Sequence, residues 1–537
     1  MAMTAHAFTR PLIIALTAGV IGLAVPHGAE AQVTAFKQTV AEQAARSDGI
    51  AAFYRARDFE PIWTGPGDTD RARRAALLEA FAMAADHGLP RDRYDDRALV
   101  AQMQAARTAR EMGEVEVALS RTFVQFAQDI QSGVLTPGQV VSLIKREAPK
   151  RSAESLLSDF ASAEPAAFLR ALPPQSYEYN RLMRAKMMME RQMEQGGWGL
   201  AVSAAKVEPG QSGAAVVALR DRLIAMGYLR PTASAVYDDA VTEAVQSFQE
   251  DNGLTVDGVA GGDTLTAINT PLEERMQSVL VAMERERWIN LPDGLGKRHI
   301  RVNLTDFSAK IVDDDKITFE TRAVIGAGGL DRQTPEFSDE MDHMVINPSW
   351  YVPRSIIVNE YLPLLRRNPG AVSHLEITDS RGRRVNRGRG FSQYSASSFP
   401  FSMRQPPGPR NALGTVKFMF PNKYNIYLHD TPAKNLFSRE VRAYSHGCIR
   451  LNDPHDFAYA LLARQSDDPQ GFFQARLRSG AETRVDLNDP VPVHLIYRTA
   501  FTTAKGQVNF RRDVYGRDAR IWQALRAAGV ALPAQRS

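Results

Sequence analysis

The chain has 537 residues, of which 44% are hydrophobic and 23% charged, and it contains a single cysteine. This composition excludes a disordered, a collagen-like or a polytopic membrane protein, and the length indicates about three or four domains. The single cysteine excludes an intramolecular disulfide and a zinc site built on several cysteines. The net charge of +4 is too small to indicate a nucleic-acid partner, so none is expected.

Residues 1–31 have the layout of a secretory signal peptide. Arg10 precedes an apolar run over 12–25, and Ala29-Glu30-Ala31 forms a small-residue cleavage pattern. The run is short for a transmembrane helix, with an uncleaved anchor as the alternative. We therefore expect an exported protein, periplasmic or associated with the cell wall, that begins at about Gln32 and has no stable membrane span after cleavage.

Residues 32–205 are predicted to form a helical scaffold domain. Strong helix formers at 75–81 predict one helix, and a third is expected at about 177–195. Between them, apolar residues at spacings of 4, 3 and 4 predict a helix over 114–130 with one buried stripe. The residues of this stripe are Leu119, Phe123, Phe126 and Ile130.

Residues 206–272 are predicted to form a small module of three short helices, the second of them capped by Asp238 or Asp239. The module resembles the PGBD-like type of peptidoglycan-binding module. The resemblance is carried by Tyr237-Asp238, Ala244-Val245, Phe248-Gln249, Gly253-Leu254, Asp257-Gly258, Gly261 and Thr264. It implies a cell-wall ligand, although packing against a neighbouring domain is the alternative, because a fold does not determine a function.

Residues 296–500 are predicted to form a β-rich domain with one or two helices. Ile300, Val302 and Leu304 alternate with polar residues, as in a half-buried strand, and a second strand is expected at 316–325. Residues 501–537 are expected to be a C-terminal tail. The predicted fold class is therefore multidomain α+β: a helical scaffold, a three-helix module and a β-rich domain.

The β-rich domain contains one strongly basic stretch. Residues 351–410 hold ten Arg, no Lys and three acidic residues. In an exported protein this pattern indicates either a solvated loop or a contact with an anionic cell-wall polymer.

The candidate chemistry lies further along the same domain. Residues 424–429 alternate in polarity, which predicts a strand that presents Tyr427 and His429 on one face. The only cysteine, Cys448, follows Gly447, where a glycine permits positive φ or a close approach of the backbone to a ligand. The sequence therefore predicts that Cys448 lies on a turn.

Asp453 and Pro454 predict the start of a helix shortly after this turn. A helix N-terminus and neighbouring positive charge both lower the pKa of a thiol, so Cys448 is a candidate nucleophile with His429 as its base. A buried structural cysteine is one alternative. A metal site with His429 and His446 is another, although it fits no standard zinc pattern.

The hexapeptide Ser445-His446-Gly447-Cys448-Ile449-Arg450, with a histidine nineteen residues before the cysteine, resembles the active-site motif of the YkuD-type L,D-transpeptidases. The domain order resembles the large periplasmic branch of that family. Further matching pieces are Asn347-Pro348-Ser349-Trp350, Val352-Pro353-Arg354-Ser355-Ile356, Asn411-Ala412-Leu413-Gly414 and Lys417-Phe418. The resemblance implies neither a cofactor nor a metal.

The resemblance implies that Cys448 attacks a donor tetrapeptide stem of peptidoglycan and forms a thioester, while His429 moves the protons. An acceptor stem then attacks and completes a 3→3 cross-link. The backbone carbonyl of Asp430 is expected to orient His429, and amides around Gly447 and Cys448 to hold the oxyanion. Carbapenem-type inhibitors are expected to react at the same cysteine.

The resemblance leaves several neighbouring residues as support or substrate contacts, namely Ser445, His446, Arg450, Tyr427 and Trp350. For Arg450 a structural ion pair is the alternative, and for Trp350 and Tyr427 it is core packing. The insertion at about 353–410 is expected to be a lid over the groove.

Two other functions use the same sequence features. With water as acceptor, the same Cys–His pair gives an L,D-carboxypeptidase or an endopeptidase. A non-catalytic cell-wall-binding protein is the alternative from a different class.

Overall fold

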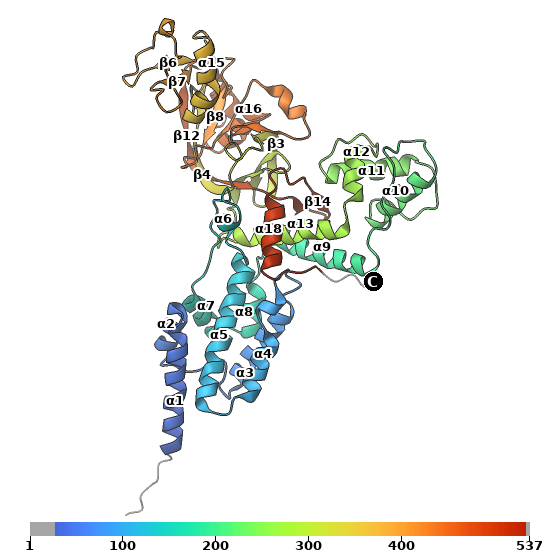
Figure 1. The fold of residues 1–537 in the computed structure, drawn as a ribbon, viewed down its shortest axis with the longest axis vertical. Coiled ribbons are helices and arrows are strands. Elements are labelled where there is room, and N and C mark those ends of the chain that lie inside the picture. The colour runs from blue at the N-terminus through green and yellow to red at the C-terminus, as the bar shows by residue number, and fades with distance from the viewer. Residues whose placement is uncertain (1–26, 533–537) are drawn as a thin grey trace, which may run out of the picture.

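The computed structural model describes residues 27–532 and has an elongated shape (Figure 1). A β-rich domain lies at one end, a helical bundle lies at the other, and a small helical module projects to one side. Most of the expected signal peptide, residues 1–26, lies outside the described residues. Within residues 27–532, no helix has both the length and the apolar character needed to cross a bilayer.

The N-terminal bundle is built around α5, the longest helix of this part of the chain. Its first turn has a capping box, in which Thr108 accepts from the Glu111 amide and the Glu111 carboxylate accepts from the Thr108 amide. α5 and α3 contain the predicted helices at 114–130 and 75–81. The bundle comprises α1 (His27–Ala44), α2 (Asp48–Ala56), α3 (Asp68–Ala82), α4 (Asp96–Ala105), α5 (Ala109–Ser132), α6 (Pro137–Val140), α7 (Ala153–Ser162) and α8 (Pro165–Ala171).

A second core joins the bundle to the rest of the chain. It lies between α9 (Tyr177–Glu194), α13 (Leu272–Trp288) and α18 (Arg517–Ala527), with the short hairpin β13 (Ala500–Thr502) and β14 (Val508–Phe510) beside them. The predicted helix at 177–195 is α9, but it packs on α13 and not in the bundle core. The sequence had assigned no role to α13.

The C-terminal segment differs from the tail that the sequence predicted. Residues 508–527 are folded, because Ile521, Trp522 and Leu525 of α18 bury an apolar stripe in the core shared with α13. The first turn of α18 is equally buried: Arg517 is fully enclosed and Asp518 is 7% exposed.

The side module consists of α10 (Ala214–Ala225), α11 (Asp239–Asp251) and α12 (Gly262–Asn269), as the sequence predicted. Asp238 caps α11 by accepting a hydrogen bond from the Val241 amide, 3.1 Å away. The helices enclose a small core of their own that includes Leu219, Val245 and Ile268.

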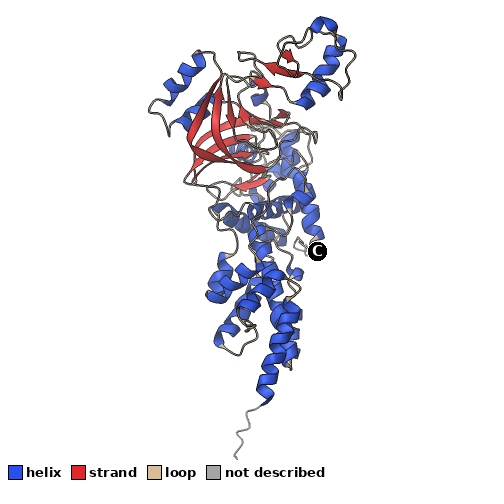
Figure 2. Cartoon of the chain, turned by 90° about the vertical axis from the view of Figure 1, so that its left-hand side faces the viewer, coloured by secondary structure: helices blue, strands red, loops and turns tan. Residues whose placement is uncertain are grey.

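The β-rich domain is a nine-stranded sheet in the order β10-β3-β11-β9-β8-β4-β12-β1-β2. β2 also pairs with β3, so the sheet closes on itself, and Figure 2 shows its strong curvature. α16 (Pro454–Leu462) and α17 (Pro469–Arg478) add apolar side chains to its core. The strands are β1 (Arg298–Asn303), β2 (Ser308–Asp313), β3 (Lys316–Gly326), β4 (Phe337–Ile346), β8 (Val416–Met419), β9 (Leu428–His429), β10 (Ala443–Ser445), β11 (Ile449–Leu451) and β12 (Thr483–Ile496).

The Arg-rich stretch folds as a small unit with its own apolar core, set apart from the main sheet (Figure 2). It contains a three-stranded sheet in the order β5-β7-β6 and a bent helical segment. Its elements are β5 (Trp350–Tyr351), α14 (Arg354–Ile356), the π-helical turn η2 (Ile357–Tyr361), α15 (Leu362–Arg367), β6 (Glu376–Thr378) and β7 (Ser402–Gln405).

Candidate active site

Strand pairing puts the predicted cysteine and histidine on adjacent segments of the sheet. β9 and β11 are parallel neighbours, with Leu428 opposite Ile449 and His429 opposite Arg450. Cys448 immediately precedes β11 and therefore lies next to Tyr427. Its thiol is partly exposed, and Sγ lies 3.5 Å from the carbonyl oxygen of Asn425.

The predicted strand over 424–429 is too long, because only Leu428 and His429 join the sheet. The preceding residues form a loop, in which Asn425 has a φ of 56°. The side chain of Asn422 takes the place of a strand partner there. Its Oδ1 accepts from the amides of Tyr424 and Ile426, and its Nδ2 donates to the carbonyl oxygen of Ile426. The ring centroids of Tyr427 and His429 nevertheless lie 5.7 Å apart, so the two side chains do meet.

The electrostatic setting of Cys448 differs from the expected one. α16 begins only at Pro454, and β11 separates it from the cysteine. Burial raises the pKa of the Cys448 thiol to about 11, although hydrogen bonding by Tyr427 and the charges of Arg450 and Lys417 act in the opposite direction. The expectation of a lowered thiol pKa is therefore wrong for this structure, because burial outweighs the neighbouring positive charge.

His429 is buried, with 4% of its surface exposed, and its orientation is determined by the backbone. Nδ1 lies 2.5 Å from the carbonyl oxygen of Asp430. A carbonyl oxygen only accepts, so Nδ1 carries the proton in the neutral ring and the lone pair is on Nε2. Burial, together with the positive charges of Arg450 and Lys417, lowers the pKa of His429 to about 3, although the hydrogen bond to Asp430 acts in the opposite direction.

The Asp430 carboxylate has a separate, structural role that the sequence did not reveal. It accepts from the amide and hydroxyl of Thr415, at 2.9 and 2.8 Å, and from the ammonium of Lys434 at 2.9 Å. These hydrogen bonds hold the pKa of the Asp430 carboxyl below its usual value, against the effect of burial. They also anchor the residue whose carbonyl oxygen orients His429.

Of the two amides expected to face an oxyanion, one is already hydrogen-bonded. Gly447 has a φ of 112°, which favours glycine, and its amide donates to Ser445 Oγ at 3.1 Å. Ser445 Oγ in turn donates to the carbonyl oxygen of Cys448 at 2.5 Å. Ser445 thus stabilises the turn through hydrogen bonds within it. Among residues 27–532, the Cys448 amide makes no hydrogen bond, so it is available to a ligand.

Two cations lie beside the histidine without a carboxylate partner. Lys417 of β8 is opposite His429, which is opposite Arg450 of β11, so the three residues form one row across neighbouring strands. Directly opposed residues share a face of a sheet. In the described part of the chain neither cation forms an ion pair, and Arg450 Nε is buried without a hydrogen-bond partner. The alternative of a structural ion pair for Arg450 is therefore not met among residues 27–532, and Lys417, named from the sequence only within the piece Lys417-Phe418, had been given no role at the site.

The remaining predicted residues connect the site to the Arg-rich unit. His446 Nε2 lies 2.5 Å from a carboxylate oxygen of Glu360, which belongs to η2. Trp350 is 8% exposed and packs in the core of the Arg-rich unit, with its ring 6.4 Å from that of Tyr361. Its position thus corresponds to the core-packing alternative, whereas His446 forms a bridge between the two units.

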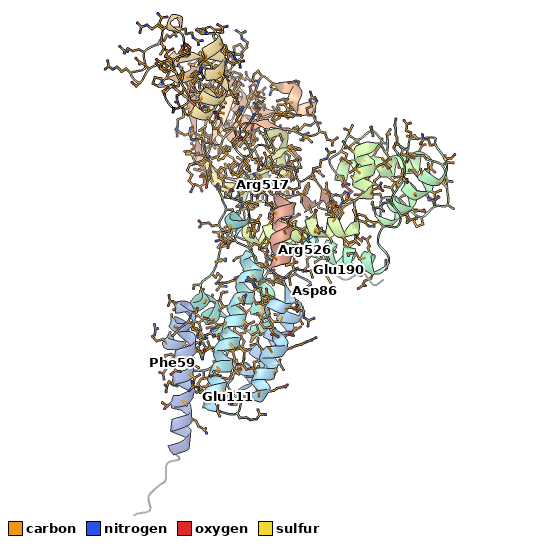
Figure 3. The ribbon with its side chains drawn as sticks, viewed as in Figure 1. Phe59, Asp86, Glu111, Glu190, Arg517 and Arg526 are labelled. Carbon is orange, nitrogen blue, oxygen red and sulfur yellow. The ribbon has the colours of Figure 1, made fainter. Side chains whose placement is uncertain are left out.

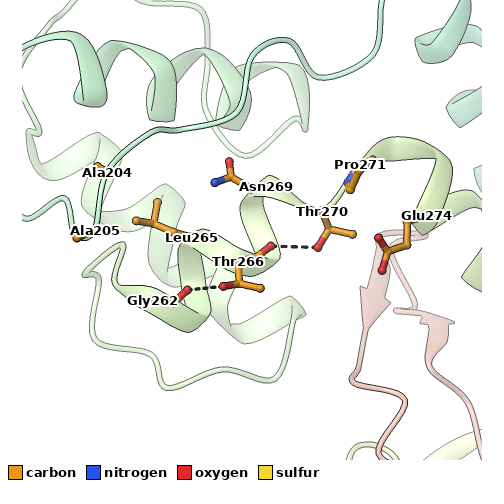
Figure 4. Close-up of a pocket in the computed structure, with 9 residues that line it drawn as sticks. All are labelled: Ala204, Ala205, Gly262, Leu265, Thr266, Asn269, Thr270, Pro271 and Glu274. Atoms are coloured by element: carbon orange, nitrogen blue, oxygen red, sulfur yellow. Dashed lines mark hydrogen bonds between the residues drawn. The ribbon is translucent and has the colours of Figure 1, made fainter. Parts of the chain in front are cut away.

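One cavity lies away from these residues, between α12 and the start of α13 (Figure 4). The polar side chains drawn in it are mostly paired within the fold: Thr266 and Thr270 donate to backbone carbonyls one turn earlier, and Asn269 bonds to the backbone of Val202. We assign it no function. Within residues 27–532, no three His, Cys, Asp or Glu side chains are grouped closely enough to hold a metal ion.

Three segments of the chain match known protein families. Residues 48–185 match a scaffold domain, 212–268 a putative peptidoglycan binding domain, and 297–487 an L,D-transpeptidase catalytic domain of the YkuD family.

Individual proteins are similar to part of the chain. A protein of Haemophilus influenzae named "Putative L,D-transpeptidase" is 29% identical over 294 residues, which are 54% of this chain and 57% of that protein. Two solved L,D-transpeptidase structures are also similar in part. That from Xylanimonas cellulosilytica has 15% identity and a TM-score of 0.17, and covers 55% of this chain and 98% of its own. The structure from Stackebrandtia nassauensis has 14% identity and a TM-score of 0.21, and the match covers 56% of this chain and 97% of that one.

Proposed function

We propose that the chain is a peptidoglycan L,D-transpeptidase that forms 3→3 cross-links through a thioester on Cys448, in keeping with the match of residues 297–487 to the YkuD L,D-transpeptidase catalytic domain. The observation that carries the proposal is the pairing of β9 with β11. The pairing puts the partly exposed Cys448 next to Tyr427, two residues before His429, whose Nδ1 lies 2.5 Å from the Asp430 carbonyl oxygen. This arrangement supports a thiol nucleophile with a neutral imidazole as its base.

In the first half-reaction, Cys448 Sγ attacks the carbonyl carbon of the third residue of a donor tetrapeptide. Because the thiol pKa is about 11 and the His429 pKa about 3, both groups are neutral near pH 7. The thiol proton must therefore move to His429 Nε2 as the S–C bond forms. The C–N bond then breaks, His429 returns the proton to the leaving amine, D-alanine departs, and a thioester remains on Cys448.

In the second half-reaction, the side-chain amine of a diamino acid in an acceptor stem attacks the thioester carbonyl. The new C–N bond forms, the S–C bond breaks, and the proton lost by the amine is taken up by His429 Nε2. Its transfer to Sγ restores the thiol. The same base thus serves both steps, which requires that its Nε2 be unprotonated at the start of each.

The amide of Cys448 is the proposed oxyanion donor, because it is the amide of the turn that has no hydrogen-bond partner among the described residues. Lys417 and Arg450 are the proposed contacts for a carboxylate of the stem peptide, since both carry an unpaired positive charge beside the thiol. Carbapenem-type compounds are proposed to acylate Cys448 at the same place.

The other parts of the chain are proposed to serve the same reaction. The module at 212–268 would hold peptidoglycan near the catalytic domain, in keeping with its family match. The Arg-rich unit would act as a lid, and the Glu360–His446 contact is its link to the cysteine turn. Such a substrate requires export, so we propose that residues 1–31 are a cleaved signal peptide and that the mature protein is periplasmic or wall-associated.

The test is incubation of purified protein with tetrapeptide muropeptides, followed by mass spectrometry of the products. We expect new 3→3 dimers, release of D-alanine, and a Cys448 acyl adduct that Cys448→Ala abolishes. Shortened stems without dimers would establish the carboxypeptidase alternative, and cleavage of existing dimers the endopeptidase. An unmodified cysteine with unchanged muropeptides, together with binding to peptidoglycan, would instead identify a non-catalytic wall-binding protein.

A further inference from the structure

The peptide bond between Gly447 and Cys448 is held by a side chain from outside the cysteine motif, that of Thr334. Thr334 is fully buried. Its Oγ1 lies 2.7 Å from the carbonyl oxygen of Gly447 and 3.0 Å from the amide nitrogen of Gly326. Because the Gly326 amide can only donate, the hydroxyl proton of Thr334 must go to the Gly447 carbonyl oxygen.

This hydrogen bond determines where the Cys448 amide points. A peptide unit is planar and trans, so its C=O and N–H groups point in opposite directions. Fixing the carbonyl of Gly447 therefore fixes the N–H of Cys448, the amide that has no hydrogen-bond partner among residues 27–532. The next carbonyl, that of Cys448 itself, is held by Ser445 Oγ at 2.5 Å. The amide is thus fixed from both sides before any ligand arrives.

Thr334 is in turn held by the C-terminal segment. Arg517 Nη2 donates to the Thr334 carbonyl oxygen at 2.7 Å, and the Thr334 amide lies 3.4 Å from the Tyr515 hydroxyl. That hydroxyl donates to the carbonyl oxygen of Gly326 at 2.5 Å. Figure 3 shows Arg517 at the start of α18, at the junction between the β-rich domain and the helices. Arg517 is fully buried and also pairs with Glu336 at 2.8 Å.

We propose that Thr334 is a positioning residue for the oxyanion site, and that Tyr515 and Arg517 make the C-terminal segment part of the catalytic unit. The inference rests on the proposed function only in that Cys448 must be acylated. The hydroxyl of Thr334 does not touch the substrate. It keeps the N–H of Cys448 pointing at the place where the acyl oxygen becomes negatively charged. The amide therefore needs no reorientation when that charge develops.

The experiment compares two reactions of Cys448 in the full chain. In acylation by p-nitrophenyl acetate, the acetyl group moves to Sγ through a tetrahedral oxyanion, and p-nitrophenolate leaves. In alkylation by iodoacetamide, Sγ displaces iodide directly and no oxyanion forms. Both rates depend on the nucleophilicity of the thiol, but only the acylation rate depends on the Cys448 amide. The ratio of the acylation rate to the alkylation rate therefore reports the contribution of the Cys448 amide.

Thr334→Val removes the hydroxyl at nearly constant volume, and Thr334→Ser keeps it. We expect Thr334→Val to lower the acylation rate by roughly tenfold or more, by comparison with the loss of an oxyanion donor, and to leave alkylation unchanged within about twofold. Thr334→Ser is expected to restore the ratio. If Thr334→Val does not fold, Tyr515→Phe removes the hydroxyl that contacts the Thr334 amide and is expected to lower the same ratio by a smaller factor.

An unchanged ratio of acylation to alkylation in Thr334→Val, or in Tyr515→Phe where that variant replaces it, overturns the inference. An equal fall in both rates overturns it as well, because a general loosening of the fold would have that effect. The test stays separate from the proposed function, since it uses a simple ester. A wild-type protein that is acylated by the ester but leaves tetrapeptide muropeptides unchanged would contradict the proposed function and not the role of Thr334.

Discussion

Lys417 and Arg450 lie on either side of His429 in a single row across β8, β9 and β11. The row follows from strand register: each residue is directly opposite the next, and opposed residues share one face of a sheet. Two positive charges therefore flank a buried imidazole, and both lower its pKa. The same charges lower the thiol pKa of Cys448, but burial raises it more. The Cys448 thiol and the His429 imidazole are therefore both neutral near pH 7.

The first prediction concerns pH. The histidine must be unprotonated to act as a base, and its pKa is lowered to about 3, so acylation should be lost only as pH falls towards that value. The thiol pKa is raised to about 11, so the thiol stays protonated up to the alkaline range. We expect the acylation rate to be nearly constant between roughly pH 5 and 9 and to slow in D₂O, because a proton moves in the rate-limiting step.

The same pKa values can be read from alkylation with iodoacetamide, which requires the thiolate. Its rate should rise about tenfold for each pH unit through the neutral range and level off only near pH 11. A plateau already reached at pH 7 would show a preformed thiolate and would contradict the neutral pair.

The second prediction concerns Arg450. Its charge lowers the pKa of both His429 and Cys448, so Arg450→Gln should move the acidic and the alkaline limits of the pH profile upward. It should also raise the KM for the donor stem by roughly tenfold, if the cation binds a stem carboxylate. Arg450→Lys, which keeps the charge, is the matched control and should keep both pH limits. A changed KM with unmoved limits would show that Arg450 does not affect the histidine.

The third prediction concerns the contact between the Arg-rich unit and the cysteine turn. Glu360 and His446 form the hydrogen bond that links them, so Glu360→Gln and His446→Ala should each loosen the unit and speed the alkylation of Cys448. Because both changes remove the same contact, the double variant should behave like either single one. Glu376→Gln, which breaks pairs with Arg384 and Arg404 inside the unit, is the control. Additive effects would mean that the contact does not restrain the unit.

The fourth prediction concerns the buried junction. Glu336, which is 3% exposed, pairs with Arg285 of α13 and Arg517 of α18, and its backbone bonds to the segment after α6. Glu336→Gln keeps the volume but leaves two buried cations with less compensation, which should lower the free energy of unfolding by about 3 kcal/mol or more.

Urea unfolding, followed by tryptophan fluorescence, measures this loss. Asp486→Asn breaks the exposed pair with Arg484 and should change the free energy of unfolding by less than about 0.5 kcal/mol. Equal effects of the two substitutions would show that the junction does not depend on the buried charges.

Local patterns were sufficient for much of the fold. The helix over 114–130, the capped helix after Asp238 and the alternating strand at Ile300 all appear in the structure, because each depends on residues close together in the sequence. The sequence also indicated His429 and Cys448 as a pair. It could not show that Asn422 would replace a strand partner and shorten β9, because alternating polarity is the same in a strand and in this loop.

By itself the sequence determined the residue types, their spacing and the candidate pair of His429 and Cys448. Only the tertiary structure decided their charge states, because the pKa of Cys448 depends on burial and on Lys417, which lies thirty-one residues away in the chain. Likewise, only the tertiary structure showed that the C-terminal segment contacts Thr334, which in turn holds the cysteine turn. Thr334, Tyr515 and Gly447 meet through hydrogen bonds between segments more than a hundred residues apart, and no local pattern records such contacts.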